Sequence, residues 1–241
     1  MMIDVVVVSK DGNFLLRDLD PEESSGDIRF FRVVNSANEN ITSIYNSFLE
    51  KFLASKETDF LVLMHADVSL DLRSLKMHIE ECSGKYDIMG LCGCEVINVS
   101  RSPLNWFTGS MDNPGRRWGC VTHGELGNQT SFFSRDREEV TDHAVSCIDG
   151  LCIIISRKAA ESGIRFNENL RFDCYDTDLC LNAIMNKGLR IGCLVETSLV
   201  HHSVGKSILG REFLDSEREM RKDLGLDMAP LEKALEKFGG I

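Results

Sequence analysis

The chain of 241 residues contains 43% hydrophobic and 27% charged residues, a composition typical of a globular protein that buries a sizeable core. Its formal net charge of -11 argues against a protein that binds nucleic acid through a broad basic surface. No apolar run approaches the roughly 18 residues that a membrane span needs. The first residues also lack the basic region of a signal peptide. We therefore expect a cytoplasmic protein, which could still act peripherally at a membrane surface.

The nine cysteines are spaced without a Cys-x-x-Cys pair, which argues against a structural zinc site. Cys147, Cys152, Cys180 and Cys193 lie within apolar runs, which predicts small buried side chains. Free thiols in this number indicate a reducing compartment.

The first third of the chain alternates apolar runs with one amphipathic stretch. Residues 3–8, 30–34 and 60–64 are short apolar runs, typical of strands that are buried on both faces. Apolar residues at helical spacing predict a helix over residues 41–53. This order predicts an α/β protein with a mostly parallel central sheet flanked by helices.

A histidine and an acid stand where the third of these strands should end. His65 and Asp67 are two residues apart, so both side chains can reach one ligand if the chain stays extended. Ligands of open α/β sheets bind beyond the carboxyl ends of the strands. A carboxylate at this place could hold Mg²⁺ or Mn²⁺ against a phosphate, or Asp67 could cap the next helix.

The pattern then predicts a helix over residues 72–82 and a strand over residues 86–92, and weakens over residues 98–145. A long irregular segment inside a compact domain is usually functional or disordered. Its two tryptophans, Trp106 and Trp118, could present aromatic faces to a ligand such as a sugar, or could anchor the segment on the core.

Strand character returns over residues 144–155, which contain Asp149 and Gly150. A glycine inside a strand predicts a kink or a close approach of another group. The rest of the chain predicts helices over 157–162 and 179–185, a strand over 189–195, and a charged helical tail over 208–241 that packs on the domain or on a partner.

Two further groups of polar residues bear on function. Asp176 and Asp178 stand at the start of a predicted helix, where they could cap the helix or act as a general base. His201 and His202 follow a predicted strand, where a neutral histidine is either buried or ligates a metal.

Taken in order, these stretches resemble the GT-A fold glycosyltransferases, in the family-2-like subgroup that has His-x-Asp in place of Asp-x-Asp. The resemblance rests on residues 35–46 with 65–68, on residues 148–150 and 166–168 with 175–181, and on residues 201–205. It implies one GT-A domain over residues 1–207, with a donor half to about residue 95, an acceptor half over about 96–207, and a separate C-terminal helical tail over 208–241.

The resemblance also implies a role for each matched position. Asp67 matches the acid that binds the divalent metal, Mn²⁺ or Mg²⁺, and His201 matches a histidine that can complete the metal site, with His202 as its rival. Asp176 matches the catalytic acid that deprotonates the acceptor hydroxyl in inverting enzymes, and Asp178 matches a second acid that is more often structural. The expected nucleotide-sugar contacts are Ser9, Asn35, Asn46, His65, Ala66 and Asp67, and the expected acceptor contacts are Trp106, Trp118, Asp149 and Gly150.

The implied activity is transfer of a hexosyl or deoxyhexosyl group from a nucleoside-diphosphate sugar to a hydroxyl of a glycan or glycolipid-type acceptor. One alternative is a non-catalytic nucleotide-sugar-binding module, against which the presence of both Asp67 and Asp176 argues. Another is a metal-dependent nucleotidyltransferase, against which the lack of a Gly-rich phosphate loop followed by a lysine argues.

Overall fold

A seven-stranded sheet forms the centre of the computed structural model, which describes residues 1–14, 26–108, 116–124, 130–133, 140–203 and 210–238. Across the sheet the strand order is β2-β1-β3-β11-β5-β12-β9. The strands are β1 (Ile3–Ser9), β2 (Ile28–Val34), β3 (Phe60–His65), β5 (Ile88–Gly90), β9 (Asp142–Val145), β11 (Cys152–Ser156) and β12 (Ile191–Leu194).

The sheet is mixed. β1 pairs in parallel with β2 and β3, and β5 pairs in parallel with β12. β11 runs antiparallel between β3 and β5, and β9 runs antiparallel to β12. The predicted α/β class is therefore confirmed. The two strands that run opposite to the others are β11 and β9. Because β11 is antiparallel to β3, the turn that precedes β11 arrives beside the carboxyl end of β3, where the Leu151 carbonyl accepts the His65 N–H at 3.1 Å.

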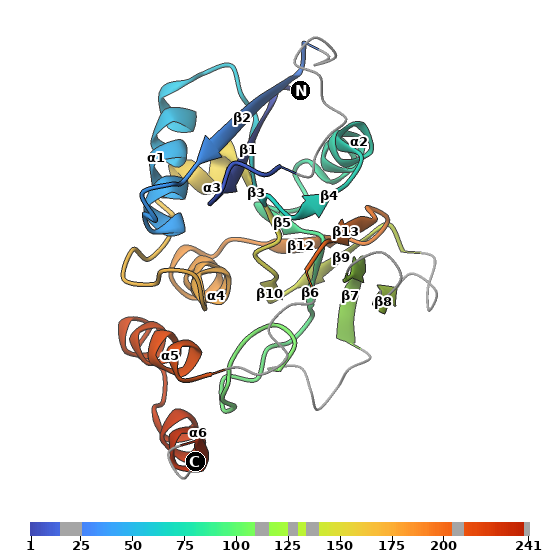
Figure 1. Cartoon of the computed structure of the whole chain (residues 1–241). Coiled ribbons are helices and arrows are strands. Elements are labelled where there is room, and N and C mark those ends of the chain that lie inside the picture. The colour runs from blue at the N-terminus through green and yellow to red at the C-terminus, as the bar shows by residue number, and fades with distance from the viewer. Residues whose placement is uncertain (15–25, 109–115, 125–129, 134–139, 204–209, 239–241) are drawn as a thin grey trace.

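Helices cover both faces of this sheet. They are α1 (Ile41–Ala54), α2 (Leu72–Cys82), α3 (Arg157–Glu161) and α4 (Tyr175–Lys187), and α1 and α2 lie on opposite sides of the β1–β3 part of the sheet (Figure 1). α1 buries Tyr45, Leu49 and Phe52 at helical spacing. The N-cap of α2 is Asp71, whose side chain accepts from the N–H groups of Arg73 and Ser74, so Asp67 does not cap this helix.

A second sheet has the order β10-β6-β7-β13-β4, with β8 paired to β7, and its β7 and β8 lie below β9 of the first sheet in Figure 1. Its strands are β4 (Val68–Ser69), β6 (Cys92–Cys94), β7 (Arg117–His123), β8 (Thr130–Phe133), β10 (Cys147–Ile148) and β13 (Leu199–His201). The expectation of an irregular segment over 98–145 is corrected here, because β7, β8 and β9 fall within it; residues 109–115, 125–129 and 134–139 lie outside the described residues. Likewise, the strand predicted over 144–155 is divided into three pieces.

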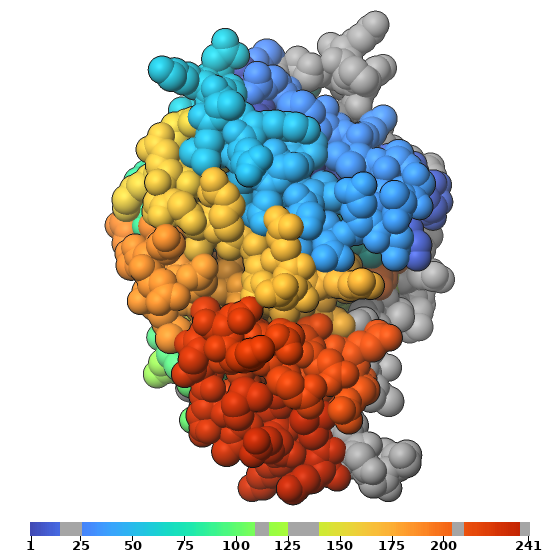
Figure 2. Space-filling model, turned by 90° about the vertical axis from the view of Figure 1, so that its left-hand side faces the viewer, coloured from blue at the N-terminus to red at the C-terminus, as the bar shows by residue number. Residues whose placement is uncertain are grey.

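The C-terminal residues form α5 (Arg211–Asp223) and α6 (Ala229–Phe238), which pack together at one end of the molecule (Figure 2). α5 buries Phe213, Leu214 and Met220, and α6 buries Leu231. Of the two alternatives for the predicted helical tail, packing on the domain is therefore the one observed.

All nine cysteines are buried and free. For Cys147, Cys152, Cys180 and Cys193 this confirms the burial predicted from their apolar runs. Burial raises the pKa of Cys152 to about 12 and that of Cys94 to about 12. Among the described residues, no helix combines the length and apolarity needed to cross a membrane.

Candidate active site

A carboxylate and two imidazoles meet at the carboxyl end of β3. Asp67 lies two residues after the end of β3 at His65, and β4, which begins at Val68, pairs with β13 so that Val68 lies opposite His201. The Oδ2 atom of Asp67 is 3.2 Å from Nε2 of His201. One ligand atom from each of His65, Asp67 and His201 lies within 4.8 Å of the other two. These three residues are called the His-Asp-His cluster below.

His201, rather than its neighbour, belongs to this cluster. Successive side chains of a strand point to opposite faces. Accordingly, Nε2 of His202 lies 2.7 Å from Oγ of Ser69, while the His202 N–H donates to the Asp67 carbonyl at 2.8 Å. His202 therefore holds the backbone of Asp67, and its ring faces Ser69.

A histidine that the sequence does not point to stands behind the cluster. His123 ends β7, which runs parallel to β13, and its Nδ1 is 3.0 Å from Nδ1 of His201. A hydrogen bond to the second ring nitrogen fixes the orientation and tautomer of a metal-ligating histidine. The sequence pattern gives no signal for His123, because only the pairing of β7 with β13 brings it beside His201.

The electrostatics of the cluster favour forms that can bind a metal. The hydrogen bond from His201 lowers the pKa of Asp67, which keeps this half-exposed carboxylate ionised at neutral pH. Burial lowers the pKa of His65 and also that of His123, which favours neutral rings. Metal ligands must be deprotonated carboxylates and neutral imidazoles, so the donor set fits a divalent ion. Two imidazole nitrogens suit a transition ion better than Mg²⁺, which prefers oxygen ligands.

The second acid of the site, Asp176, lies in the first turn of α4. Its Oδ2 accepts the Gly150 N–H at 2.9 Å, and its Oδ1 accepts the Thr177 N–H at 2.6 Å. These bonds orient the carboxylate. Burial, followed by the nearby negative charge of Asp149, raises the pKa of Asp176 to about 7. Asp176 is thus an acid whose two protonation states are balanced near neutral pH.

One residue, Gly150, joins the two halves of the site through its N–H and its carbonyl. The Gly150 carbonyl accepts the hydroxyl of Tyr175 at 3.1 Å, and that hydroxyl lies 2.7 Å from Nε2 of His65. With the hydroxyl donating to Gly150, Nε2 of His65 is the donor and its Nδ1 keeps a lone pair. A Cβ atom at position 150 would lie 2.2 Å from the Tyr175 hydroxyl oxygen, so the close approach predicted for this glycine is confirmed.

A pocket of about 150 Å³ opens between these groups. Both His65 and Asp176 line it, and Trp106, Phe172 and Phe213 contribute apolar surface. Phe172 is 54% exposed and stacks on the His65 ring, with 5.7 Å between ring centroids. The site therefore brings an aspartate near its pKa and one member of the metal-binding cluster, His65, to a small, partly aromatic hollow.

The two tryptophans occupy different places. Trp106 is buried and lines the pocket, where its Nε1–H donates to Oδ2 of Asp149 at 2.5 Å. Trp118 is buried in β7, stacks on His143 at 3.8 Å, and stands five residues, or about 16 Å, from the strand end at His123. Of the two alternatives for these residues, anchoring is the one observed for Trp118.

Several predicted residues lie outside the pocket. Asp178 is buried beside Asn167, and burial raises the pKa of its carboxyl to about 6. Both ends of the Asn46 amide bond the backbone of Phe166, so this side chain joins α1 to the turn before α4 instead of facing the pocket.

The remaining predicted donor contacts stand at strand ends. The Asn35 amide closes its own turn on the backbone of Glu39, and Oγ of Ser9 donates to Asp11 at 3.0 Å. Ala66 lies between two members of the His-Asp-His cluster, and both Ser9 and Asn35 lie at the carboxyl edge of the main sheet.

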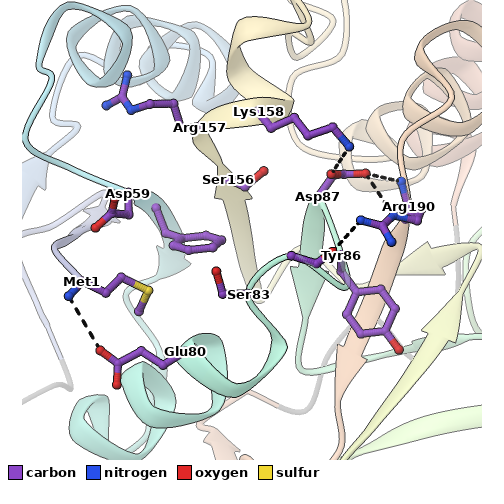
Figure 3. Close-up of a pocket in the computed structure, with 12 residues that line it drawn as sticks. Met1, Asp59, Glu80, Ser83, Tyr86, Asp87, Ser156, Arg157, Lys158 and Arg190 are labelled. Atoms are coloured by element: carbon purple, nitrogen blue, oxygen red, sulfur yellow. Dashed lines mark hydrogen bonds and ion pairs between the residues drawn. The ribbon is translucent and has the colours of Figure 1, made fainter.

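A larger hollow of about 720 Å³ lies at the opposite edge of the sheet, beside the first residue of β3 (Figure 3). Its charged groups neutralise one another: Lys158 bonds Asp87 at 2.8 Å, and Nε of Arg190 lies 3.6 Å from the same carboxylate. Arg157 donates to backbone carbonyls, including that of Thr58. Because these groups already bind one another, they are less available to a ligand than the residues that line the pocket at the carboxyl edge.

Comparison with known proteins finds similarity in fold, through solved structures. No family model and no curated protein matches the chain. Residues 1–349 of S. aureus TarS, solved in complex with UDP-GlcNAc, match with a TM-score of 0.52 and 14% identity over 97% of this chain and 69% of that one. GalNAc-T7, solved with UDP, GalNAc and Mn²⁺, matches with a TM-score of 0.52 and 10% identity over 99% of this chain and 54% of that one. At these identities the comparison shows fold alone, and the chain has the GT-A glycosyltransferase fold that its sequence predicts.

Proposed function

We propose that the chain is a metal-dependent glycosyltransferase that moves a sugar from a nucleoside-diphosphate sugar to an acceptor hydroxyl with inversion. The observation that carries the proposal is that one pocket is lined both by Asp176 and by His65, which belongs to the His-Asp-His cluster. The GT-A fold supports it, as do the UDP, UDP-GlcNAc and Mn²⁺ named with the similar structures.

The donor diphosphate would bind at the carboxyl end of β3. His65, Asp67 and His201 would hold the divalent ion, and Mn²⁺ fits their mixed nitrogen and oxygen donors. When bound, the ion supplies Lewis-acid stabilisation of the charge that develops on the departing diphosphate. Ser9 and Asn35, at neighbouring strand ends, are the proposed contacts to the nucleotide.

Asp176 is the proposed general base. An acceptor hydroxyl has a pKa far above 7, so a positioned group must take its proton as the oxygen attacks the anomeric carbon. A base is most effective when its pKa lies near the working pH, and the pKa of Asp176 is raised to about 7 by burial and by Asp149. Attack from the side opposite the diphosphate, in a single displacement, inverts the anomeric centre.

The proposed substrates are a hexosyl or deoxyhexosyl donor and a hydroxyl of a glycan or glycolipid-type acceptor. Phe172 and Trp106 give the acceptor end of the pocket an apolar wall suited to the flat face of a sugar. A cytoplasmic location is part of the proposal, because nine free buried thiols fit a reducing compartment.

The test is thermal stabilisation of the protein by a panel of nucleoside diphosphates and nucleotide sugars, with Mn²⁺, with Mg²⁺ and with a chelator. A ligand that binds only the folded state raises the melting temperature by mass action. We expect one nucleotide to stabilise the protein, and to do so only with metal. Stabilisation by no member of the panel would contradict the proposal.

Product analysis separates the two alternatives. Release of a nucleoside diphosphate from the stabilising nucleotide sugar indicates sugar transfer, whereas release of pyrophosphate from a nucleoside triphosphate indicates nucleotidyl transfer. Tight binding without either product would favour a non-catalytic module.

A further inference from the structure

Helix α5 reaches the pocket from the end of the chain. Phe213, in its first turn, is buried and lines the pocket together with Trp106 and Asp176. In Figure 1, α5 lies beside α4 and next to the segment that follows β6. Two residues of α5 bind that segment directly, and they are charged.

Glu217 and Arg221 form an ion pair that is completely shielded from solvent. The Nε atom of Arg221 donates to Oε1 of Glu217 at 2.7 Å, and both side chains are 0% exposed. Removing two charges from water is costly, and their attraction offsets that cost only when further hydrogen bonds satisfy the remaining donors and acceptors. The groups that form these further hydrogen bonds therefore show which part of the chain the ion pair holds in place.

Most of those partners belong to residues 99–104. Oε2 of Glu217 accepts the Ser102 hydroxyl at 2.9 Å and the Leu104 N–H at 3.1 Å. Arg221 donates to the carbonyl oxygens of Val99 and Arg101 in the same segment and, within the tail, to that of Asp227. The ion pair thus fixes a stretch of backbone that forms neither helix nor strand.

The next two residues are Asn105 and Trp106, which line the pocket. Two residues of extended chain span at most about 7 Å, so the Glu217 contacts limit where Trp106 can lie. The indole N–H of Trp106 in turn donates to Asp149, which neighbours the Gly150 peptide that orients Asp176. A continuous series of contacts leads from α5 to the proposed base.

We infer that α5 is part of the acceptor end of the pocket, and that Glu217 is a positioning residue that holds the 99–104 backbone so that Asn105 and Trp106 form the pocket wall. The term acceptor end rests on the proposed function. The positioning of Trp106 by Glu217 does not rest on the proposed function, because it concerns only where the indole ring is held. In consequence, α5 is an integral part of the site, although the sequence predicts a tail separate from the GT-A domain.

The experiment follows the indole N–H of Trp106 by ¹H–¹⁵N NMR. The chain has two tryptophans, so Trp118→Phe assigns the two indole signals. The test variants are Glu217→Gln, which removes the charge from the buried pair, and Ser102→Ala, which removes one hydrogen bond and leaves the pair intact. Glu219→Gln is the matched control, because it makes the same change on an outer position of α5 where the side chain is 44% exposed.

Glu217→Gln should accelerate hydrogen exchange of the Trp106 indole N–H by about tenfold or more, with a smaller acceleration in Ser102→Ala, because local opening exposes this group. Exchange of the Trp118 indole should stay unchanged in both. A purely structural role for Glu217 would instead accelerate exchange of both indoles together, and that result would overturn the inference. So would unchanged Trp106 exchange in folded Glu217→Gln; if that variant does not fold, Ser102→Ala decides by the same criterion.

A parallel titration with UDP and Mn²⁺ keeps the two proposals distinguishable. We expect Glu217→Gln to bind UDP as the wild type does, since the Glu217 contacts with Ser102, Leu104 and Arg221 lie outside the His-Asp-His cluster. Loss of UDP binding in Glu217→Gln alone would contradict the assignment of α5 to the acceptor end. Failure of the wild type to bind any nucleotide would contradict the proposed function, while the indole measurement would still decide whether Glu217 positions Trp106.

Discussion

Asp67 and Asp176 are the same residue type in one candidate site, and their surroundings shift their pKa values in opposite directions. Asp176 lines the pocket, whereas Asp67 belongs to the cluster that reaches the pocket through His65. Asp67 is half-exposed, and the hydrogen bond from His201 lowers its pKa. Asp176 is more enclosed and lies near a second acid, Asp149, and its pKa is raised to about 7. Asp67 therefore keeps a permanent negative charge, and Asp176 can gain or lose a proton near neutral pH.

This difference shows how one site can divide two tasks between two identical side chains. A pair of titratable groups whose environments separate their pKa values is a general sign of an acid–base assignment. The charged carboxylate suits a metal and a diphosphate, and the balanced one suits proton transfer. The following predictions test this division, beginning with the largest expected effect.

Asp176→Asn should remove the proposed proton acceptor and leave the His-Asp-His cluster intact. We expect release of nucleoside diphosphate from the donor to fall by about 10²–10⁴-fold, the usual contribution of a general base. Affinity for UDP with Mn²⁺ should not change. Asp178→Asn is the control, because it makes the same substitution two residues later at a position outside the pocket; equal loss of rate in both variants would contradict the special role of Asp176.

Asp67→Ala and His201→Ala should remove the metal-dependent part of UDP binding. The expected loss of affinity for UDP is roughly 100-fold. Each variant removes a proposed metal ligand, so we take the upper end of the range known for residues that only orient such ligands. Calorimetric titration with UDP, in Mn²⁺ and in chelator, measures the effect. His202→Ala is the matched control, since its ring faces Ser69. If His202→Ala loses as much affinity as His201→Ala, the placement of the metal site is wrong.

His123→Phe tests whether the His-Asp-His cluster needs its supporting histidine. The substitution keeps a ring but removes the contact of 3.0 Å to Nδ1 of His201. Loss of such an orienting bond should weaken Mn²⁺ binding by about tenfold. Direct Mn²⁺ titration, followed by electron paramagnetic resonance of the free ion, provides the value. Unchanged affinity would show that His201 is oriented by its strand alone.

The smallest expected effect is a shift in pH dependence. Asp176 can accept a proton only when ionised, so the transfer rate should fall as the pH drops through about 7, where its pKa lies. Asp149→Asn removes a negative charge that opposes this ionisation, so the fall should move to lower pH. Rate profiles of the two proteins between pH 5 and 9 measure the shift. A profile that moves upward, or does not move, would exclude Asp149 as a cause of the raised pKa.

The sequence predicts the elements whose apolar spacing is regular. β1, β3 and α1 agree closely with the apolar runs that predict them. β7 escapes prediction because Gly119 interrupts its apolar residues, and the polar residues at its two ends leave no regular alternation. Its Gly119 has a φ of 134°, and a Cβ atom there would lie 2.5 Å from the Leu91 carbonyl oxygen, so tertiary contact determines this residue.

The site is partly predictable for a similar reason. His65 and Asp67 are visible because they directly follow a regular strand, and their place at its end needs no tertiary information. His123, Tyr175 and Glu217 act through contacts with residues at least 78 positions away along the chain, which no local pattern records. Asn46, which the resemblance matches to the nucleotide pocket, bonds the backbone of Phe166, 120 positions away, and no local pattern records that contact either.

The buried thiols have a practical consequence for studying this molecule. Only the thiolate reacts quickly with maleimides and iodoacetamides, and burial both shields the nine native sulfur atoms and raises the pKa of most of them, Cys152 to about 12 among them. A single cysteine introduced at an exposed position, such as Phe172, would then be the one fast-reacting thiol in the folded protein. A fluorophore attached there would report ligand entry at the mouth of the pocket without any native cysteine being replaced.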